Sequence, residues 1–402
     1  MVDQRHDEVR AQYERWVYPP PIEDLSKSAG RDFSDPAFLG RAYWPHRRPR
    51  EDLRILVAGC GPNAAARLAY HHRGAAVVGV DLSEASLAHA RRLKERHGLD
   101  NLALHRMRVE EVASLGQSFD LIDCSGVLHH LPDPAAGLKA LAASLAPDGV
   151  VYLMLYGRYG RAGIYMAQAL FRILGLQQSP EDVATVKAVL AALPADHPVR
   201  RRAGPDDLGF DAGIVDTFLH PIDRGFSVGD CLDLLDSTGL VLQGWLNRFG
   251  YDPASRITQP ELRSRLASLP ERAAWEALEL IDARIASHNF YACRRDRDPA
   301  QYRIDFAGTG FMDRVPVPRM GWARSAAGSG LLLRSVDGAV LELRERRATV
   351  AALIDGRRTV RACFLDAGSA FESPQFVASF CRDLFRQLWI AGYCDLVHAD
   401  AA

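Results

Sequence analysis

The sequence lacks an excess of charge of either sign. Its 402 residues include 49 lysine and arginine residues against 50 aspartate and glutamate residues, which gives a formal net charge of −1. A protein that binds nucleic acid through the phosphate backbone normally carries an excess of basic residues. Local clusters such as Arg47–Arg50 and Arg200–Arg202 are therefore interpreted as solvated surface, and we expect no nucleic-acid partner.

Long apolar runs and paired cysteines are also missing. No stretch approaches the roughly 18 uninterrupted apolar residues of a membrane-spanning helix, and the polar start MVDQRHDEVR shows no secretory signal. The seven cysteines form no CxxC pair and their number is odd, so neither a disulfide framework nor a zinc site is expected. We predict no metal, no membrane partner and a reducing, cytoplasmic location.

A glycine turn between two apolar segments is the strongest motif in the chain. The strand-like run Ile55–Val57 leads into the turn GCGPN (residues 59–63), and a second run, Ala75–Val80, ends in Asp81. Glycine at position 61 would let a ligand approach bare backbone amides, and a carboxylate about 20 residues further on can accept both hydroxyls of a ribose. The motif predicts a nucleoside-binding site. The alternative is a tight turn with a purely structural role.

Strand-like and helix-like segments alternate over residues 52–155. We expect strands at residues 53–58, 75–80, 102–106, 119–124 and 150–155, with helical segments between them. Alternation at these lengths predicts an α/β fold with a doubly wound, mostly parallel sheet, whose ligands bind at the carboxyl ends of the strands. A nicotinamide-dependent dehydrogenase would fit this pattern.

Three later features point to another class. The fourth strand runs into a loop with paired histidines, FDLIDCSGVLHHLPDP (residues 119–134), Pro-Asp-Gly at 147–149 predicts a turn before the fifth strand, and a last strand is expected at Ser287–Arg294. With the glycine turn and Asp81, residues 52 to about 160 resemble a class I S-adenosylmethionine-dependent methyltransferase. This resemblance implies a Rossmann-like methyltransferase fold, an antiparallel last strand and S-adenosyl-L-methionine as the cofactor.

The resemblance also assigns cofactor contacts. The glycine turn would approach the methionine end, Asp81 would hold the ribose, and the residues after the fourth strand would lie near the transferable methyl group. Where the family usually places an aspartate near the adenine, this chain has Arg108, so Glu110 or amides around Val109 would substitute. The implied cofactor-binding residues are Gly59, Cys60, Gly61, Asp81, Leu82, Val109, Glu110, Ser125 and Gly126.

Three histidines are candidate catalytic residues. His129 and His130 follow the fourth strand, and His220 lies in the segment FLHPIDR (residues 218–224). An imidazole titrates near neutrality and could accept a proton from a hydroxyl or an amine. The alternative is that each ring packs against its loop and has no catalytic role.

Composition divides the chain into three regions. Residues 1–50 form an aromatic arm that either packs on the surface or closes over the site as a lid, and residues 51–297 form the core with a helical cover insertion at about 158–215. Residues 298–402 predict a hairpin around Asp337-Gly338 and three helices, a small α+β pattern similar to winged-helix domains that regulate methyltransferases or recognise peptides. Because no recognition helix is clearly basic, we favour substrate docking or homodimer formation over DNA binding.

The sequence therefore predicts methyl transfer to an oxygen or nitrogen nucleophile of a peptide, protein or small-molecule acceptor. Two alternatives remain open: a nicotinamide-dependent oxidoreductase, and a protein that binds S-adenosylmethionine without turnover.

Overall fold

The computed structural model describes residues 2–27, 33–201, 208–328, 330–336, 339–368 and 372–402. The chain forms two compact units. Unit 1 comprises residues 1–32, 51–245 and 257–295, and unit 2 comprises residues 33–50, 246–256 and 296–402. Among the described residues, no helix combines the length and the apolar character needed to cross a bilayer.

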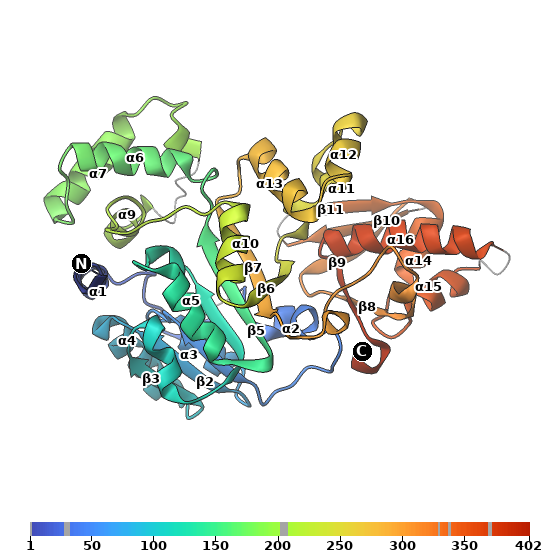
Figure 1. Cartoon of the computed structure of the whole chain (residues 1–402), viewed down its shortest axis with the longest axis horizontal. Coiled ribbons are helices and arrows are strands. Elements are labelled where there is room, and N and C mark those ends of the chain that lie inside the picture. The colour runs from blue at the N-terminus through green and yellow to red at the C-terminus, as the bar shows by residue number, and fades with distance from the viewer. Residues whose placement is uncertain (1, 28–32, 202–207, 329, 337–338, 369–371) are drawn as a thin grey trace. The chain divides into compact units, whose positions relative to one another are not determined.

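A seven-stranded sheet forms the centre of unit 1 (Figure 1). The strand order is β3-β2-β1-β4-β5-β7-β6, with β1 to β5 parallel and β7 antiparallel to both of its neighbours. The predicted doubly wound, mostly parallel sheet is therefore confirmed. The strands are β1 (Arg54–Ala58), β2 (Ala76–Asp81), β3 (Leu102–Arg106), β4 (Phe119–Ser125), β5 (Leu145–Tyr156), β6 (Leu240–Trp245) and β7 (Ser287–Arg294).

Helices begin and end at the residues that favour their termini. Ser83 caps α4 by accepting the amide of Ser86, Asp133 caps α5 by accepting two amides, and Gly98 ends α4 in the left-handed conformation. The core helices are α3 (Ala64–His71), α4 (Glu84–His97), α5 (Pro134–Ala143), α10 (Val228–Ser237), α12 (Pro260–Ala267) and α13 (Glu271–Asp282), with 3-10 turns η1 (Leu25–Lys27), η2 (Val109–Leu115), η3 (Leu128–His130) and η4 (Pro198–Arg201).

The predicted turn at residues 147–149 is incorporated into the fifth strand. Strand β5 begins at Leu145, and its pairing with β4 shifts register between Phe119 and Leu121. A bulge accommodates extra residues in a strand without ending it. The Pro-Asp-Gly sequence therefore marks an irregular strand start and not a separate turn.

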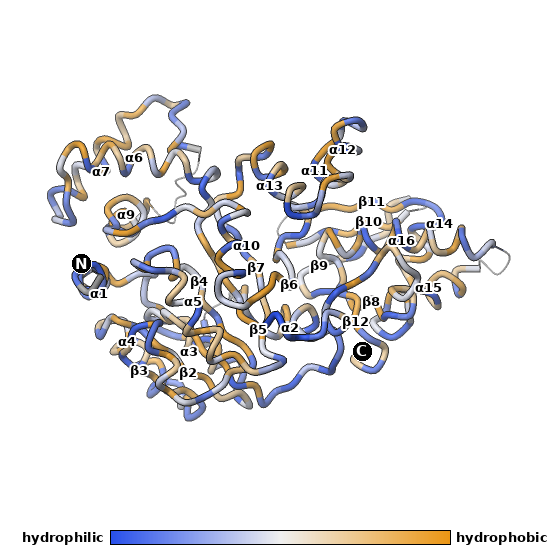
Figure 2. Tube along the Cα trace, viewed as in Figure 1, coloured by the Kyte–Doolittle hydropathy of each residue, from blue (hydrophilic) through white to orange (hydrophobic). Residues whose placement is uncertain are grey.

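The insertion after β5 builds a small helical layer with its own core. It contains α6 (Ala162–Ile173), α7 (Pro180–Ala192) and α9 (Asp211–Phe218), which Figure 1 shows together beside the carboxyl end of the sheet, near the N-terminal helix α1 (Val2–Arg15). Figure 2 colours α6 and α9 as mainly hydrophobic. Their apolar faces meet in a cluster that includes Phe171, Val186 and Phe218, and burial of such faces stabilises the layer.

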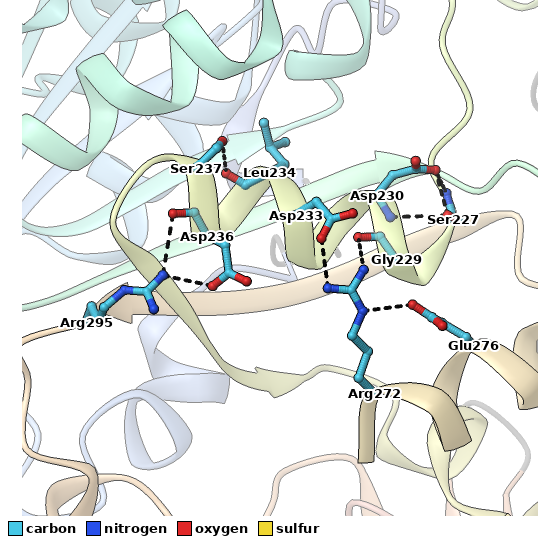
Figure 3. A network of polar contacts seen from close by, with 10 residues as sticks. All are labelled: Ser227, Gly229, Asp230, Asp233, Leu234, Asp236, Ser237, Arg272, Glu276 and Arg295. Atoms are coloured by element: carbon cyan, nitrogen blue, oxygen red, sulfur yellow. Dashed lines mark hydrogen bonds and ion pairs between the residues drawn. The ribbon is translucent and has the colours of Figure 1, made fainter. Parts of the chain in front are cut away.

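A polar network fixes helix α10 (Figure 3). Ser227 and Asp230 form a reciprocal capping box at its start, and the guanidinium of Arg272 on α13 bonds Asp233 at 2.8 Å and Glu276 at 2.9 Å. The start of α10 is thereby defined, directly after the loop at residues 219–226 that approaches the site described below.

Unit 2 is a small α+β assembly around one apolar core. Strands β10 and β11 pair antiparallel from Leu331↔Leu343 to Arg334↔Val340, as predicted, whereas Asp337-Gly338 lies outside the described residues. The core includes Phe364, Phe385 and Leu388. The elements of unit 2 are α2 (Pro36–Tyr43), η5 (Arg248–Tyr251), α11 (Pro253–Arg256), η6 (Pro299–Gln301), η7 (Gly310–Asp313), β8 (Val315–Pro318), β9 (Trp322–Ala327), β10 (Gly330–Ser335), β11 (Val340–Leu343), α14 (Glu345–Ala352), α15 (Val360–Asp366), α16 (Pro374–Ile390), β12 (Cys394–Val397) and η8 (Ala399–Ala401).

Two segments that the sequence analysis assigned to other regions belong to unit 2 in the structure. Residues 33–50 were assigned to the arm and residues 246–256 to the core. The second segment is held by Arg248, which bonds Asp395 at 3.0 Å and the carbonyl of Trp389 at 3.0 Å and lies over the Trp389 ring. The winged-helix assignment of residues 298–402 stays a prediction.

Candidate active site

The turn after β1 exposes its backbone to a cavity. Gly59 and Gly61 have φ angles of 67° and 53°, a region that favours glycine. A Cβ on Gly59 would lie 2.4 Å from Cγ2 of Val127, so a larger residue would displace that side chain. The amides of Gly59 and Cys60 donate to the carbonyl of Val80 at 2.8 and 3.0 Å, which ties the turn to β2.

Asp81, at the end of β2, closes the turn from the other side. Its Oδ2 accepts the amide of Gly61 and its Oδ1 accepts the amide of Ser83, both at 2.8 Å. Burial raises the pKa of Asp81, and these N–H groups oppose that rise. Because an ionised carboxylate has about four lone-pair positions, acceptor capacity remains for a hydroxyl group.

A cavity of about 310 Å³ opens at the carboxyl ends of the parallel strands, where α/β sheets bind their ligands. This volume is within the range of small-molecule sites. Leu82, Met107 and Val109 form an apolar wall, and Met154 lies at the end of β5. The predicted cofactor residues that line the cavity are Gly59, Cys60, Gly61, Asp81, Leu82, Val109, Ser125 and Gly126.

Three predicted site residues lie outside the lining. Glu110 bonds the ring of His6 at 3.0 Å, whereas the neighbouring Val109 lines the cavity with Leu82 and Met107. His129 is fully buried and stacks on Tyr156 at 3.8 Å, and neither ring nitrogen has a hydrogen-bond partner among the described residues. Burial, together with the neighbouring His130, lowers the pKa of His129 well below its usual range. His220 stacks behind His130 at 3.8 Å.

His130 is the one predicted catalytic histidine that lines the cavity. Its Nδ1 lies 2.7 Å from the carbonyl oxygen of Ile222. A carbonyl can only accept a hydrogen bond, so Nδ1 carries the proton and Nε2 is the acceptor in the neutral ring. His130 can therefore take up a proton at Nε2 without breaking its existing bond.

The lining includes further polar residues that were not among the predicted site residues, and two of them, Asp216 and Tyr13, contact each other. Asp216, on α9, is 2% exposed, and its Oδ1 accepts the Tyr13 hydroxyl at 2.9 Å. Burial raises the pKa of Asp216, although His130 opposes the rise. The available signal was an acidic residue within the mainly apolar run IVDTFL (214–219), four positions before His220.

The N-terminal arm contributes to the same cavity. Val9 and Tyr13 of α1 and the Tyr18-Pro19 segment line it, and Pro19 lies 3.6 Å from where a Cβ on Gly61 would be. The aromatic arm thus lies against the glycine turn. Its closure as a lid stays a prediction.

Comparisons with known proteins agree with this geometry. Residues 56–151 match a family model described as "Methyltransferase domain". An uncharacterized protein of Synechococcus sp. is 28% identical over 80% of this chain and 75% of its own length. The ubiquinone biosynthesis O-methyltransferase of Neisseria meningitidis is 31% identical over 29% of this chain, and this match spans about half of that enzyme (49%).

A solved structure has a similar fold. PKMT2 from Rickettsia typhi, in complex with AdoHcy, is similar with a TM-score of 0.66 over 95% of this chain and 77% of that chain, at 14% identity. At this identity the likeness concerns the fold alone. Fold, family model and cavity together show that the chain carries an S-adenosylmethionine-dependent methyltransferase domain.

The residues present fit this cofactor. The glycine turn lines the cavity, Asp81 keeps acceptor capacity for the ribose hydroxyls, and Leu82, Met107 and Val109 suit the apolar faces of an adenine ring. Adenine recognition would rest on this apolar wall and on backbone groups.

Proposed function

We propose that this protein transfers a methyl group from S-adenosylmethionine to a hydroxyl oxygen of a small-molecule or peptide acceptor. One observation carries the proposal: His130, whose Nε2 is the hydrogen-bond acceptor of the neutral ring, lines the cavity together with the glycine turn and Asp81. A base is useful when the nucleophile must lose a proton, as a hydroxyl must. The Neisseria relative is named an O-methyltransferase, which supports an oxygen acceptor.

The bound cofactor would supply an electrophilic methyl group on a sulfonium sulfur. The chain's own residues would bind and orient the cofactor and the acceptor, and would exclude water. Asp81 would accept hydrogen bonds from the ribose hydroxyls, and the apolar wall would enclose the adenine ring. Holding the acceptor oxygen in a reactive geometry can contribute several kcal/mol to catalysis. His130 would take the hydroxyl proton at Nε2, which general-base catalysis typically rewards with a rate gain of about 10²–10⁴-fold.

Calorimetric titration with S-adenosylhomocysteine and, separately, with NAD tests the cofactor class. We expect micromolar-range binding of S-adenosylhomocysteine only. Gly61→Val should abolish this binding, because the side chain would occupy the space over the turn. Gly98→Val is the matched control, since Gly98 has a similar φ of 57° but open space around it. Binding of NAD alone, or normal binding by a folded Gly61→Val variant, would refute the assignment.

For unit 2 we propose a role in acceptor docking or homodimer formation. Its surface carries a cleft of about 720 Å³ lined by residues 342–347 together with Phe380 and Gln387. Light scattering of the full chain across a concentration series tests the dimer. A monomer at all concentrations would leave docking as the remaining role.

A further inference from the structure

Four side chains from three segments form one cluster, of which three line the cavity and His220 lies behind them. They are Tyr13 on α1, His130 on η3, Asp216 on α9 and His220 directly after α9. The rings of His130 and His220 stack with centroids 3.8 Å apart and planes 26° apart. One ligand atom from each of His130, Asp216 and His220 lies within 4.8 Å of the others. The arrangement could serve either a proton or a cation, and the hydrogen bonds decide between them.

The backbone of one residue fixes both imidazoles. The carbonyl oxygen of Ile222 accepts from His130 Nδ1 at 2.7 Å, and the amide of Ile222 donates to His220 Nδ1 at 3.0 Å. An amide can only donate, so His220 holds a lone pair at Nδ1 and, in the neutral ring, a proton at Nε2. The two stacked rings are therefore held in opposite tautomers, with His130 Nε2 as an acceptor and His220 Nε2 as a donor.

The donor on His220 starts a directed chain. Its Nε2 lies 3.4 Å from the hydroxyl of Tyr13, which in turn donates to Asp216 Oδ1 at 2.9 Å. Each group in this chain donates toward the carboxylate. Asp216 is thus supplied with a hydrogen bond that favours its charged form despite deep burial.

A metal ion does not fit this pattern. Two histidines and an aspartate are a common ligand set, and a ligating histidine needs its lone pair directed at the ion. At His220 the lone pair is already occupied by the amide of Ile222. Coordination through Nε2 would require loss of the ring's proton, and the hydroxyl of Tyr13 competes for the same position.

We propose that Asp216 is a positioning residue that stabilises the protonated form of His130, and that Tyr13 and His220 hold Asp216 in its charged state for this purpose. This inference rests on the proposed function and names its base. In the reaction the acceptor oxygen forms a bond to the methyl carbon as the carbon–sulfur bond breaks. The electron pair of that bond stays on sulfur, and the hydroxyl proton moves to His130 Nε2. The assembly serves acceptors that lose a proton on methylation.

The other groups around His130 do not replace Asp216. The ring of His129 lies 4.2 Å away and is held neutral by burial, and the ring of Tyr156 lies edge-on at 5.6 Å. The nearby cation Arg161 lies over Tyr156 at 3.5 Å and is paired with Asp223 at 3.1 Å. Among these neighbours Asp216 is the carboxylate that shares the cavity lining with His130.

Side-chain nitrogen NMR of the full chain, labelled at histidine, tests the proposal without an acceptor. The signals are assigned with His130→Gln and His220→Gln. We expect the Nδ1–H tautomer for His130 and the Nε2–H tautomer for His220. At a fixed, mildly acidic pH, Asp216→Asn should lower the ratio of protonated to neutral His130 by about tenfold or more, as expected for loss of an opposite charge at close range. Asp123→Asn removes another buried carboxylate, on β4, and should leave this ratio unchanged.

Three results would overturn the proposal. They are identical tautomers for the two rings, an unchanged His130 ratio in Asp216→Asn, and stoichiometric Zn²⁺ binding by the wild type that Asp216→Asn abolishes. Titration with S-adenosylhomocysteine separates this failure from that of the proposed function. If the wild type and Asp216→Asn both bind it while the NMR expectation fails, the cofactor assignment stands and the role of Asp216 does not.

Discussion

Two buried aspartates, one in each unit, have opposite surroundings. Asp216 in unit 1 is 2% exposed and faces the Tyr13 hydroxyl and imidazole rings, and burial raises its pKa. Asp395 in unit 2 is 3% exposed, and it bonds Arg319 twice at 2.7 Å and Arg248 at 3.0 Å. Burial would raise the pKa of Asp395, but the two arginines outweigh it and lower the pKa to about 2.

The difference distinguishes a structural charge, on Asp395, from the charge that we propose to be functional, on Asp216. The charge on Asp395 is neutralised by two guanidinium groups. Its role is structural, because these ion pairs hold residues 246–256 to the rest of unit 2. The carboxylate of Asp216 accepts the neutral Tyr13 hydroxyl, and Arg161 acts on it at longer range. We therefore propose that its charge responds when a proton arrives on His130. A buried carboxylate without an arginine partner costs folding free energy, and such a cost is often tolerated where it serves a site.

The largest expected effect concerns Asp395. Asp395→Ala removes the carboxylate that Arg248, which is 8% exposed, bonds at 3.0 Å, and breaking one side of a buried ion pair typically costs about 3–5 kcal/mol. Hydrogen exchange of the unit 2 amides measures this loss. Asp313→Ala, which removes an exposed partner of Arg361 in the same unit, should cost less than about 1 kcal/mol. Equal losses in the two variants would contradict a structural role for the Asp395 pairs.

Asp81 is a third carboxylate to compare with these two, and its hydrogen-bond donors are backbone amides. Asp81→Ala should weaken binding of S-adenosylhomocysteine by about 1.5–3 kcal/mol, the value of hydrogen bonds to a charged group. Calorimetry measures the change. Asp120→Ala is the control, because Asp120 accepts the amide of Arg54 at the opposite end of the strands. Unchanged affinity in Asp81→Ala would show that Asp81 only braces the turn.

The local parts of this picture could be predicted from the sequence. The glycine turn, Asp81 and the alternating strands lie within about 100 consecutive residues, where spacing and hydrophobic pattern determine the structure. The contacts that define the two aspartates span much longer distances along the chain: Tyr13 and Asp216 are 203 positions apart, and Arg248 and Asp395 are 147 apart. No local pattern encodes such pairs, so Asp216 was missed and residues 246–256 were assigned to the core.

Contacts between residues far apart in the sequence also determine where the arm and Glu110 lie. The aromatic residues of the arm predicted that it packs on the surface or closes over the site as a lid. Its position against the glycine turn depends on the fold of the whole unit. Glu110 occupies the expected position after β3, yet His6 of α1 lies within 3.0 Å of it. A partner from a distant segment therefore contacts a side chain that the local motif placed near the adenine, and the role of Glu110 in cofactor binding stays a prediction.

The pH dependence of the unfolding free energy should have opposite signs for the two aspartates. The pKa of Asp395 is about 2 in the folded chain, against about 4 for an unfolded aspartate, so its contribution is complete above pH 4 and lost as the pH falls toward 2. The loss should amount to about 2 kcal/mol. Denaturant unfolding of unit 2 between pH 2 and 5 measures it. Asp395→Asn should flatten this pH dependence, and an unaltered slope would contradict the assigned shift.

The smallest effect on stability is expected at Asp216. The raised pKa of Asp216 means that the folded chain holds this proton more tightly than the unfolded chain does, so the residue lowers stability as the pH rises above the usual range of an aspartate. Asp216→Asn keeps an oxygen that can accept the Tyr13 hydroxyl but removes the buried charge. We expect the free energy of unfolding of unit 1 at pH 7 to be unchanged or higher by up to about 1 kcal/mol. Denaturant titration at pH 7 tests this expectation, and a loss above about 2 kcal/mol would place Asp216 with Asp395 as a structural residue.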